Sequence, residues 1–245
     1  MAVEPSGYVY ETLRADEEFS LYRVRQEGEP STVLVVAPVS EYPSPGSLAR
    51  LEHAYSLRDE LDSDWAVRPI ALTRQGRQIE LVLEDPSPEA AGLDRLLGSP
   101  IELGRFLRLA INLAGALGKL HQQGLIHKDI KPVNILVDAL TARVWFTGFW
   151  FASRLRREQH AAEPPEVIAG TLAYMAPEQT GRMNRSIDSR SDLYSLGITL
   201  YQMLTGALPF EASDAMGWVH CHIARQPPRP SERVAGVPEP ISAIA

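Results

Sequence analysis

The sequence is poor in cysteine, in positive charge and in long apolar runs. Its 245 residues contain one cysteine, Cys221, so no disulfide can form within the chain. The formal net charge is −7, which argues against nucleic acid as a partner because phosphate binding needs clustered positive charge. No run approaches the roughly 18 apolar residues of a membrane span, and the N-terminus has no basic-then-apolar secretion signal. We therefore expect a cytoplasmic protein without a membrane span.

Lysine is also scarce. Of the 24 basic residues only three are lysines, Lys119, Lys128 and Lys131, so the chain has none before residue 119. The hydrophobic content of 44% and the charged content of 22% are ordinary for a folded globular chain. The length suffices for one large domain or for two lobes with cores of their own. The chain is expected to fold, but a function that needs a lysine in its first half is excluded.

The first part of the chain has the pattern of a small, strand-rich unit. Residues 8–85 contain two short apolar stretches, TVLVVAPV and QIELVLED, on either side of a helical pattern at 47–61. The segment DPSPEAAG at 85–92 contains two prolines and a glycine, and we interpret it as a break between elements.

The second part is expected to be mostly helical. The stretch at 101–124 has apolar residues at helical spacing and closes with Gly124. A second helix is expected at 191–206, opened by an Asp or Ser cap and ended by Gly206.

A dense polar turn, GLIHKDIKPVNILVD, lies between these two helical patterns. Such a turn between buried elements usually carries chemistry. Within it, HKDIKPVN at 127–134 is followed by GTLAYMAPE at 170–178 and by SDLYSLGITLYQMLTGALPF at 191–210. In this order and at these spacings the three motifs resemble the C-terminal lobe of Ser/Thr protein kinases.

More narrowly, the run APEQTGRMNRSIDSRSDLYSLG resembles the kinase-like module at the N-terminus of large bacterial signalling proteins, which continue into NTPase, sensor and histidine kinase modules. The resemblance covers about residues 8–245. It implies an α+β, two-lobed protein-kinase-like fold, with a strand-rich N-lobe at 8–85 and a larger helical C-lobe at 86–245 that is incomplete at its C-terminus. The implied partners are another protein or the downstream modules of the same polypeptide.

The resemblance assigns catalytic roles to three residues of the polar turn. Asp129 would accept the proton of a substrate hydroxyl, Lys131 would steady the transferred phosphate, and Asn134 would hold a magnesium ion. The lysine at 131 favours Ser/Thr over Tyr substrates. Leu136 would lie under an adenine. The other positions implied on the adenine side are Leu83, Glu84 and Ser87.

Five further residues are expected to support the site without chemistry. His127 and Phe149 would pack in the core, and Thr171 would brace the turn. The Asp192 carboxylate would accept backbone N–H bonds from residues 127–129. Glu178 would pair with an arginine near the end of the domain or with a local one. The local candidates are Arg182, Arg185 and Arg190.

The ion pair that grips the nucleotide phosphates in kinases is missing from this sequence. A kinase needs a lysine on its third strand, and here Val36 or Ala37 stands at that place. Arginine does not readily replace the point-like lysine ammonium at a tight site. Ala54 stands where the glutamate partner of the lysine is expected, with Glu52 as a neighbouring alternative.

The devices that cover the phosphates and hold magnesium are missing too. The stretch LRADEEFSLYRVR, which corresponds to the glycine-rich loop, contains no glycine and carries three adjacent carboxylates that would repel a triphosphate. We expect a solvated acidic turn there. Gly148-Phe149-Trp150 replaces the Asp-Phe-Gly motif, so the magnesium aspartate is absent. Asp138 is the nearest downstream carboxylate and is expected to face away.

Three smaller features complete the prediction. The segment from Arg154 to Gly170 has no Ser, Thr or Tyr, so phosphorylation cannot switch it on. HCH at 220–222 is a weak metal candidate, because alternate residues of a helix face different sides. An aromatic cluster is expected to form a core that fills the emptied nucleotide cleft, with a partner-binding face as the alternative. Its members are Trp145, Phe146, Phe149, Trp150 and Phe151.

Two function hypotheses follow. The leading one is a pseudokinase-type regulatory or interaction module that binds a partner and needs no cofactor. The alternative is an unconventional Ser/Thr kinase that uses ATP and magnesium, with Asp129, Lys131 and Asn134 in place and an arginine replacing the missing lysine.

Overall fold

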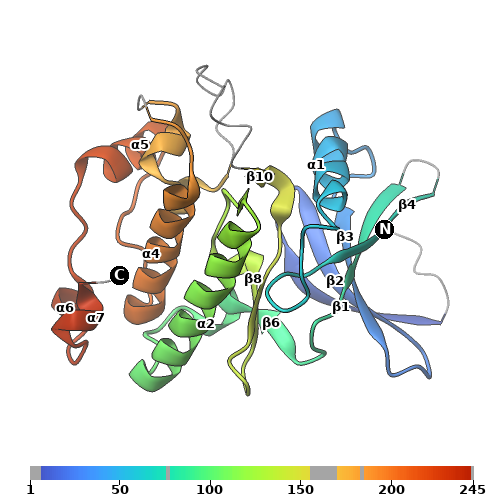
Figure 1. The fold of residues 1–245 in the computed structure, drawn as a ribbon, viewed down its shortest axis with the longest axis horizontal. Helices are drawn as coiled ribbons and strands as arrows, with labels where there is room; N and C mark the ends of the chain where they lie inside the picture. The colour runs from blue at the N-terminus through green and yellow to red at the C-terminus, as the bar shows by residue number, and fades with distance from the viewer. Residues whose placement is uncertain (1–6, 76–77, 155–169, 183–184, 244–245) are drawn as a thin grey trace.

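The computed structural model describes residues 7–75, 78–154, 170–182 and 185–243, and it places an antiparallel sheet beside a group of helices (Figure 1). The five strands of this sheet lie in the order β1-β2-β3-β5-β4. Their bounds are β1 (Tyr8–Ala15), β2 (Phe19–Gln26), β3 (Thr32–Pro38), β4 (Pro69–Gln75) and β5 (Gln78–Glu84). The two predicted apolar strands are confirmed as β3 and β5, which pair with each other.

Helix α1 (Pro45–Ser56) packs against the sheet, and we call the sheet and α1 the small lobe. The side chain of Ser44 caps α1 by accepting a hydrogen bond from the Ser47 N–H at 3.0 Å. The helix ends five residues before the predicted end at residue 61, because the following turn buries Leu57 and Leu61 without continuing the helix. Helical spacing of apolar residues therefore extended past the helix itself.

The remaining described chain forms the large lobe, in which two long helices lie side by side (Figure 1). Helix α2 (Leu103–Gln122) is followed by Gly124 at φ 74°, and α4 (Ser189–Thr205) by Gly206 at φ 75°, as glycine allows. Helix α4 begins two residues earlier than predicted, because its cap is Asp188, which accepts a hydrogen bond from the Arg190 N–H. Both predicted helices are confirmed.

Shorter elements connect and extend these helices. The short helices are α5 (Ala215–Ala224), α6 (Pro230–Arg233) and α7 (Glu239–Ser242). The 3-10 turns are η1 (Leu93–Leu96), η2 (Pro132–Asn134), η3 (Phe149–Phe151), η4 (Leu172–Tyr174) and η5 (Pro177–Thr180). The short strands are β6 (Ala90–Gly92), β7 (Leu125–Ile126), β8 (Ile135–Asp138), β9 (Val144–Phe146) and β10 (Ser153–Arg154). The α+β, two-lobed fold class is thus confirmed.

Strand β6 corrects one prediction. The segment 85–92 was expected to be a break, but its last three residues pair with β8, with Ala90 opposite Asp138. Local sequence favours a turn here, whereas the pairing partner lies more than forty residues away and leaves no local signal. The segment therefore supplies the edge strand of a three-stranded sheet, in the order β6-β8-β9, and also connects the two lobes.

Two apolar cores hold the lobes together, and we call them the small-lobe core and the large-lobe core. The small-lobe core combines the sheet and α1 with Leu136, Trp145 and Trp150, which come from the second half of the sequence. The large-lobe core surrounds α2 and includes Leu57 and Trp65 from the first half. Because each core draws on both halves, packing continues from one lobe into the other.

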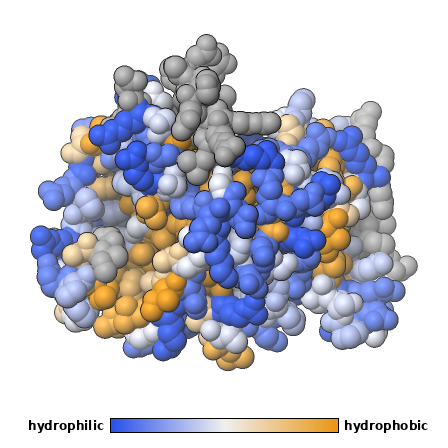
Figure 2. Space-filling model, in the orientation of Figure 1, coloured by the Kyte–Doolittle hydropathy of each residue, from blue (hydrophilic) through white to orange (hydrophobic). Residues whose placement is uncertain are grey.

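The surface gives no sign of a membrane-spanning element. None of the described helices is long and apolar enough to cross a lipid bilayer. Figure 2 shows hydrophilic side chains over much of one face, with hydrophobic side chains gathered at the lower left, near α6 and α7. Partly buried hydrophobic residues that pack against the large-lobe core include Leu103, Leu107, Val237 and Ile241.

Candidate functional site

The polar turn after β7 is held from below by Asp192 on α4. The fully buried Asp192 carboxylate accepts hydrogen bonds from the backbone N–H groups of His127 and Lys128, both at 2.8 Å, and from the His121 ring at 2.9 Å. Lys128 has φ 67°, a left-handed conformation that a lysine rarely adopts. The Gln179 side chain, which sequence reasoning missed, donates to the Lys128 carbonyl at 2.8 Å. The strained turn is therefore fixed from two sides.

Asp129, Lys131 and Asn134 lie together in this turn. One Asp129 carboxylate oxygen accepts a hydrogen bond from the Thr171 N–H at 3.0 Å. The other accepts from the Asn134 amide at 2.9 Å and lies 2.9 Å from the Lys131 ammonium, which also donates to the Thr171 hydroxyl. Asp129 is only 5% exposed. Each of its two carboxylate oxygens thus faces at least one donor of the chain itself.

His127 and Phe149 lie beneath the turn, in the core. The fully buried His127 ring packs against Phe149 at 4.7 Å and Phe146 at 5.8 Å between centroids. Its Nε2 donates to the Thr147 carbonyl at 3.0 Å. Burial lowers the pKa of His127 below its usual value, although Asp192 and Asp129 oppose the shift. The packed His127 ring therefore supports the turn from below.

Glu178 lies at the start of η5. Its carboxylate accepts a hydrogen bond from the Ser191 hydroxyl at 2.5 Å, while Arg190 forms its ion pair with Asp188 at 2.7 Å. Arg182 donates to the Met216 sulfur at 3.7 Å. The bond described for Glu178 therefore comes from a serine on α4, and an arginine partner stays a prediction.

The residues predicted on the adenine side lie in two places: the small-lobe core, and the end of β5 with the segment that follows it. Leu83 and Leu136 are 3% and 1% exposed and belong to the small-lobe core. The Glu84 carboxylate accepts a hydrogen bond from the Ser63 hydroxyl, and the Ser87 hydroxyl donates to Asp138 at 3.3 Å. The structure thus brings the two leucines together and gives Glu84 and Ser87 other partners.

The position of the missing phosphate-gripping ion pair is filled with apolar atoms. Val36 is fully buried and Ala54 is 3% exposed, and both belong to the small-lobe core. Glu52, the alternative glutamate, forms a surface ion pair with Arg74. No register shift within α1 brings a carboxylate into this core, because Ala54 occupies the inward position.

The predicted aromatic cluster is divided between the two cores. Trp145 and Trp150 belong to the small-lobe core, whereas Phe146 and Phe149 belong to the large-lobe core. The Trp150 indole stacks on Phe19 of β2, with ring centroids 5.0 Å apart and an interplanar angle of 29°. The predicted core is thus shared between two cores, because neighbouring residues of β9, Trp145 and Phe146, face opposite lobes.

The residues present do not fit a magnesium ion. Gly148 has no side-chain ligand atom, and the Asn134 amide oxygen accepts a hydrogen bond from Arg14 at 2.5 Å. Asp138 folds back onto its own turn, and the backbone N–H groups of Thr141 and Leu140 lower the pKa of its carboxyl. Within the described ranges, no group of three His, Cys, Asp or Glu residues could hold a metal ion.

Arg14 is the site residue that the sequence did not reveal. Strand alternation predicts that one of Leu13 and Arg14 faces solvent, yet they are 5% and 8% exposed. The pairing of β1 with β2 shifts register between Thr12 and Arg14, and such a bulge turns two adjacent side chains inward. The acidic turn that follows is exposed at Asp16 and Glu17, as expected.

A second arginine, on β2, connects the sheet to residues 85–90, which lead from the small lobe to the large lobe. Arg23 on β2 pairs with the buried Asp85 at 2.7 Å. It also donates to the carbonyls of Ser87 at 3.0 Å and Ala90 at 2.7 Å. This network and the pairing of β6 with β8 together fix residues 85–92.

The HCH segment has structural partners in place of a metal. His222 bonds to the Tyr194 hydroxyl and the Leu172 carbonyl, both at 2.8 Å. Cys221 is buried, and His220 is exposed on another side of α5. The predicted activation segment lies mostly at 155–169, outside the described residues.

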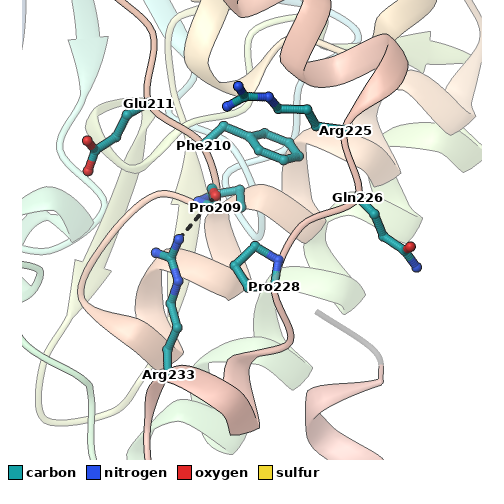
Figure 3. A pocket seen from close by; sticks show the side chains of 7 residues that line it. All are labelled: Pro209, Phe210, Glu211, Arg225, Gln226, Pro228 and Arg233. Carbon is teal, nitrogen blue, oxygen red and sulfur yellow. Dashed lines mark hydrogen bonds between the residues drawn. The ribbon is translucent and has the colours of Figure 1, made fainter.

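An open pocket lies away from the catalytic turn, at the turn between α4 and α5 and beside α6 (Figure 3). Arg233 donates to the Pro209 carbonyl at 3.2 Å across this pocket. None of the predicted catalytic residues lines it. The lining residues are Pro209, Phe210, Glu211, Arg225, Gln226, Pro228 and Arg233.

Comparison with known proteins places the chain among kinases. A family model described as "Protein kinase domain" matches residues 55–234. Serine/threonine-protein kinase pkn3 of Myxococcus xanthus is 34% identical over 139 residues, which cover 55% of this chain and 25% of that protein. Serine/threonine-protein kinase PknB of Mycobacterium tuberculosis is 33% identical over 145 residues, or 59% of this chain and 23% of that protein. The chain thus matches about a quarter of the length of these relatives.

Proposed function

Because the chain belongs to the protein kinase family, we propose that it is a pseudokinase-type regulatory module of bacterial signal transduction with weak or no ATP-dependent phosphoryl transfer. The observation that carries the proposal is the apolar filling of the nucleotide side. Val36, Ala54, Leu136 and Trp150 belong to one continuous core in which each is at most 8% exposed.

The physical reason is the charge of the nucleotide. A triphosphate carries several negative charges, and burying an unpaired charge among apolar side chains is very costly. Catalysis of phosphoryl transfer depends on positioning the phosphates and neutralising their charge. A cleft with valine and alanine at the ion-pair positions offers neither function.

The state of the catalytic turn supports the same proposal. Asp129 is buried and its carboxylate is bound by Thr171, Asn134 and Lys131. A general base must reach the proton that it abstracts. Here three donors of the chain hold the carboxylate in the shape of the turn, and the side chain is only 5% exposed.

A module without chemistry acts through its contacts. The contacts that we propose are with another protein or with further modules of its own polypeptide, in the cytoplasm. The relatives named as Ser/Thr kinases are bacterial, which supports a bacterial signalling setting.

An active, unconventional Ser/Thr kinase is the second candidate, and one observation favours it. The three catalytic residues lie together, and Arg14 brings a buried cation to Asn134. That arginine is a candidate for the charge that the missing lysine would supply.

Nucleotide binding separates the two candidates. A ligand at 100 times its Kd stabilises a protein by about 2.7 kcal/mol, and each kcal/mol raises the Tm of a domain this size by roughly 2–4 °C. An ordinary kinase should shift by at least about 5 °C in millimolar Mg-ATP. We expect a shift below about 2 °C, with no difference between magnesium and EDTA.

The control for catalysis is Asp129→Asn, which keeps the shape of the side chain and removes the base. Radiolabelled phosphate incorporation should be equally absent in both proteins. A large magnesium-dependent shift, with incorporation that disappears in Asp129→Asn, would establish the active kinase instead.

A further inference from the structure

Arg14 reaches the catalytic turn because of the bulge in β1. The register shift between Thr12 and Arg14 turns Arg14 inward, beside Leu13. From outside, the Arg95 guanidinium donates to the carbonyls of Thr12 at 2.9 Å and Leu13 at 3.1 Å. The bulge is thus fixed by a side chain from η1, and the inward direction of Arg14 is built into the fold.

The contacts of Arg14 are with the backbone and side chain of the catalytic turn. Its Nη1 donates to the Asn134 amide oxygen at 2.5 Å and to the Val133 carbonyl at 3.1 Å. The Asn134 amide nitrogen points the other way, to the Asp129 carbonyl at 2.8 Å and its carboxylate at 2.9 Å. Asn134 therefore presents to Arg14 the oxygen that the family resemblance assigns to a magnesium ion.

Electrostatics explain why a cation is retained here. Arg14 is only 8% exposed to solvent, and burial lowers its pKa. Asp16, Asp129 and Asp94 oppose this shift, and the Asp16 carboxylate lies 3.8 Å from the Arg14 Nε. Nε and Nη2 make no hydrogen bond to any described residue. The charge is therefore faced by the Asp16 carboxylate and by the two oxygens that Nη1 binds.

Gly148 is the steric counterpart of Arg14. A Cβ atom at position 148 would lie 2.6 Å from the Asn134 amide oxygen and 2.7 Å from its Cγ, and Gly148 has φ 80°. No side chain fits there while Asn134 is bound to Arg14. An aspartate at 148 requires the Asn134 side chain to move, and its oxygen, which Arg14 binds, is the atom most crowded.

From this arrangement we propose that Arg14 is an internal cation that takes the place of the divalent ion in the catalytic turn, and that Gly148 is coupled to it through Asn134. The proposal deepens the proposed function and rests on it. In it, the Arg14 guanidinium binds the Asn134 oxygen that would otherwise be available to a metal ion. The absence of an aspartate at 148 and the contact of Arg14 with Asn134 are then two parts of one arrangement.

The test combines Gly148→Asp with Arg14→Met, which removes the charge but retains an unbranched side chain of similar length. Titration with Mn²⁺ alone, followed by its electron paramagnetic resonance signal, gives the metal affinity of each variant. We expect no binding at millimolar Mn²⁺ for the wild type or for Gly148→Asp. Arg14→Met with Gly148→Asp should bind at least about tenfold more tightly than either, because a carboxylate and the Asn134 oxygen are then both available. Arg25→Met with Gly148→Asp is the matched control, since Arg25 is exposed on the same hairpin, and it should behave as Gly148→Asp alone.

A thermal-unfolding cycle of the same variants gives a second readout that does not depend on metal. Gly148→Asp should lower Tm by several degrees less in the Arg14→Met background than in the wild type, because a shift of Asn134 then no longer disturbs a bond to Arg14. An equal loss of Tm in both backgrounds, or Mn²⁺ binding that is the same with and without Arg14, would overturn the proposal. Failure of the proposed function is a separate result, since it appears as Mg-ATP binding by the wild type.

Discussion

The catalytic turn and the nucleotide side have opposite compositions. In the turn, polar atoms are buried and paired: Asp192 accepts bonds from the backbone N–H groups of His127 and Lys128. On the nucleotide side, Val36 and Trp150 lie in an apolar core. The difference shows that a catalytic motif can persist for structural reasons, because its buried polar groups need each other even where no phosphate is bound.

The largest effect is expected on the apolar side. Trp150→Ala should lower the free energy of unfolding by about 3–5 kcal/mol, because the indole is 8% exposed and stacks on Phe19. Urea unfolding measures the change, with Phe151→Ala as a control for a partly buried neighbour. An unchanged midpoint would show that Trp150 does not fill the core.

The anchor of the turn should be nearly as important. Asp192→Ala leaves two buried backbone N–H groups without their acceptor and should cost about 3 kcal/mol. Asp59→Ala, at a surface position where 81% of the side chain is exposed, should change stability by less than about 0.5 kcal/mol. If the two substitutions had equal effects in a denaturant melt, Asp192 would not be the anchor.

Acid should destabilise the fold through two buried histidines, one in the catalytic turn and one on α5. Burial lowers the pKa of both His127 and His222 in the folded state from the usual 6.5, so below about pH 6.5 the unfolded chain binds more protons. Their contribution to stability is complete above that pH. It is lost as the pH falls through 6.5 toward the lowered values, by at most about 1.4 kcal/mol per pH unit for each histidine.

The measurement is the free energy of unfolding at pH 7.5 and 5.5. His222 donates from Nε2 to the Leu172 carbonyl and accepts from the Tyr194 hydroxyl, so protonation disturbs the second bond. His222→Gln should reduce the pH dependence while His127 continues to contribute. A slope that is identical in this variant would exclude His222 as a source.

The smallest effect is expected at Glu52. This residue forms an exposed ion pair with Arg74, in which the two side chains are 49% and 64% exposed. Glu52→Ala should change the free energy of unfolding by less than about 0.5 kcal/mol. It should leave any residual nucleotide-induced Tm shift unchanged, and a clear loss of that shift would restore Glu52 as the partner of a phosphate-binding cation.

Much of the fold could be predicted because its signals are local. The apolar spacing of α2 and α4 and their closing glycines gave two helices, and short apolar stretches gave β3 and β5. Strand β6 could not be predicted, because its pairing with β8 depends on residues far along the chain. The division of the aromatic segment between two cores had the same origin.

The sequence by itself determined what chemistry the chain lacks: no lysine precedes residue 119, and no carboxylate stands at 148. Residue identity is enough for such a statement, because a missing functional group cannot be supplied by folding. Only the tertiary structure decided what fills the emptied site. A bulge between Thr12 and Arg14 turns an arginine from the first strand into contact with Asn134, 120 residues away in the sequence. That outcome depends on strand register and long-range packing, which no local pattern encodes.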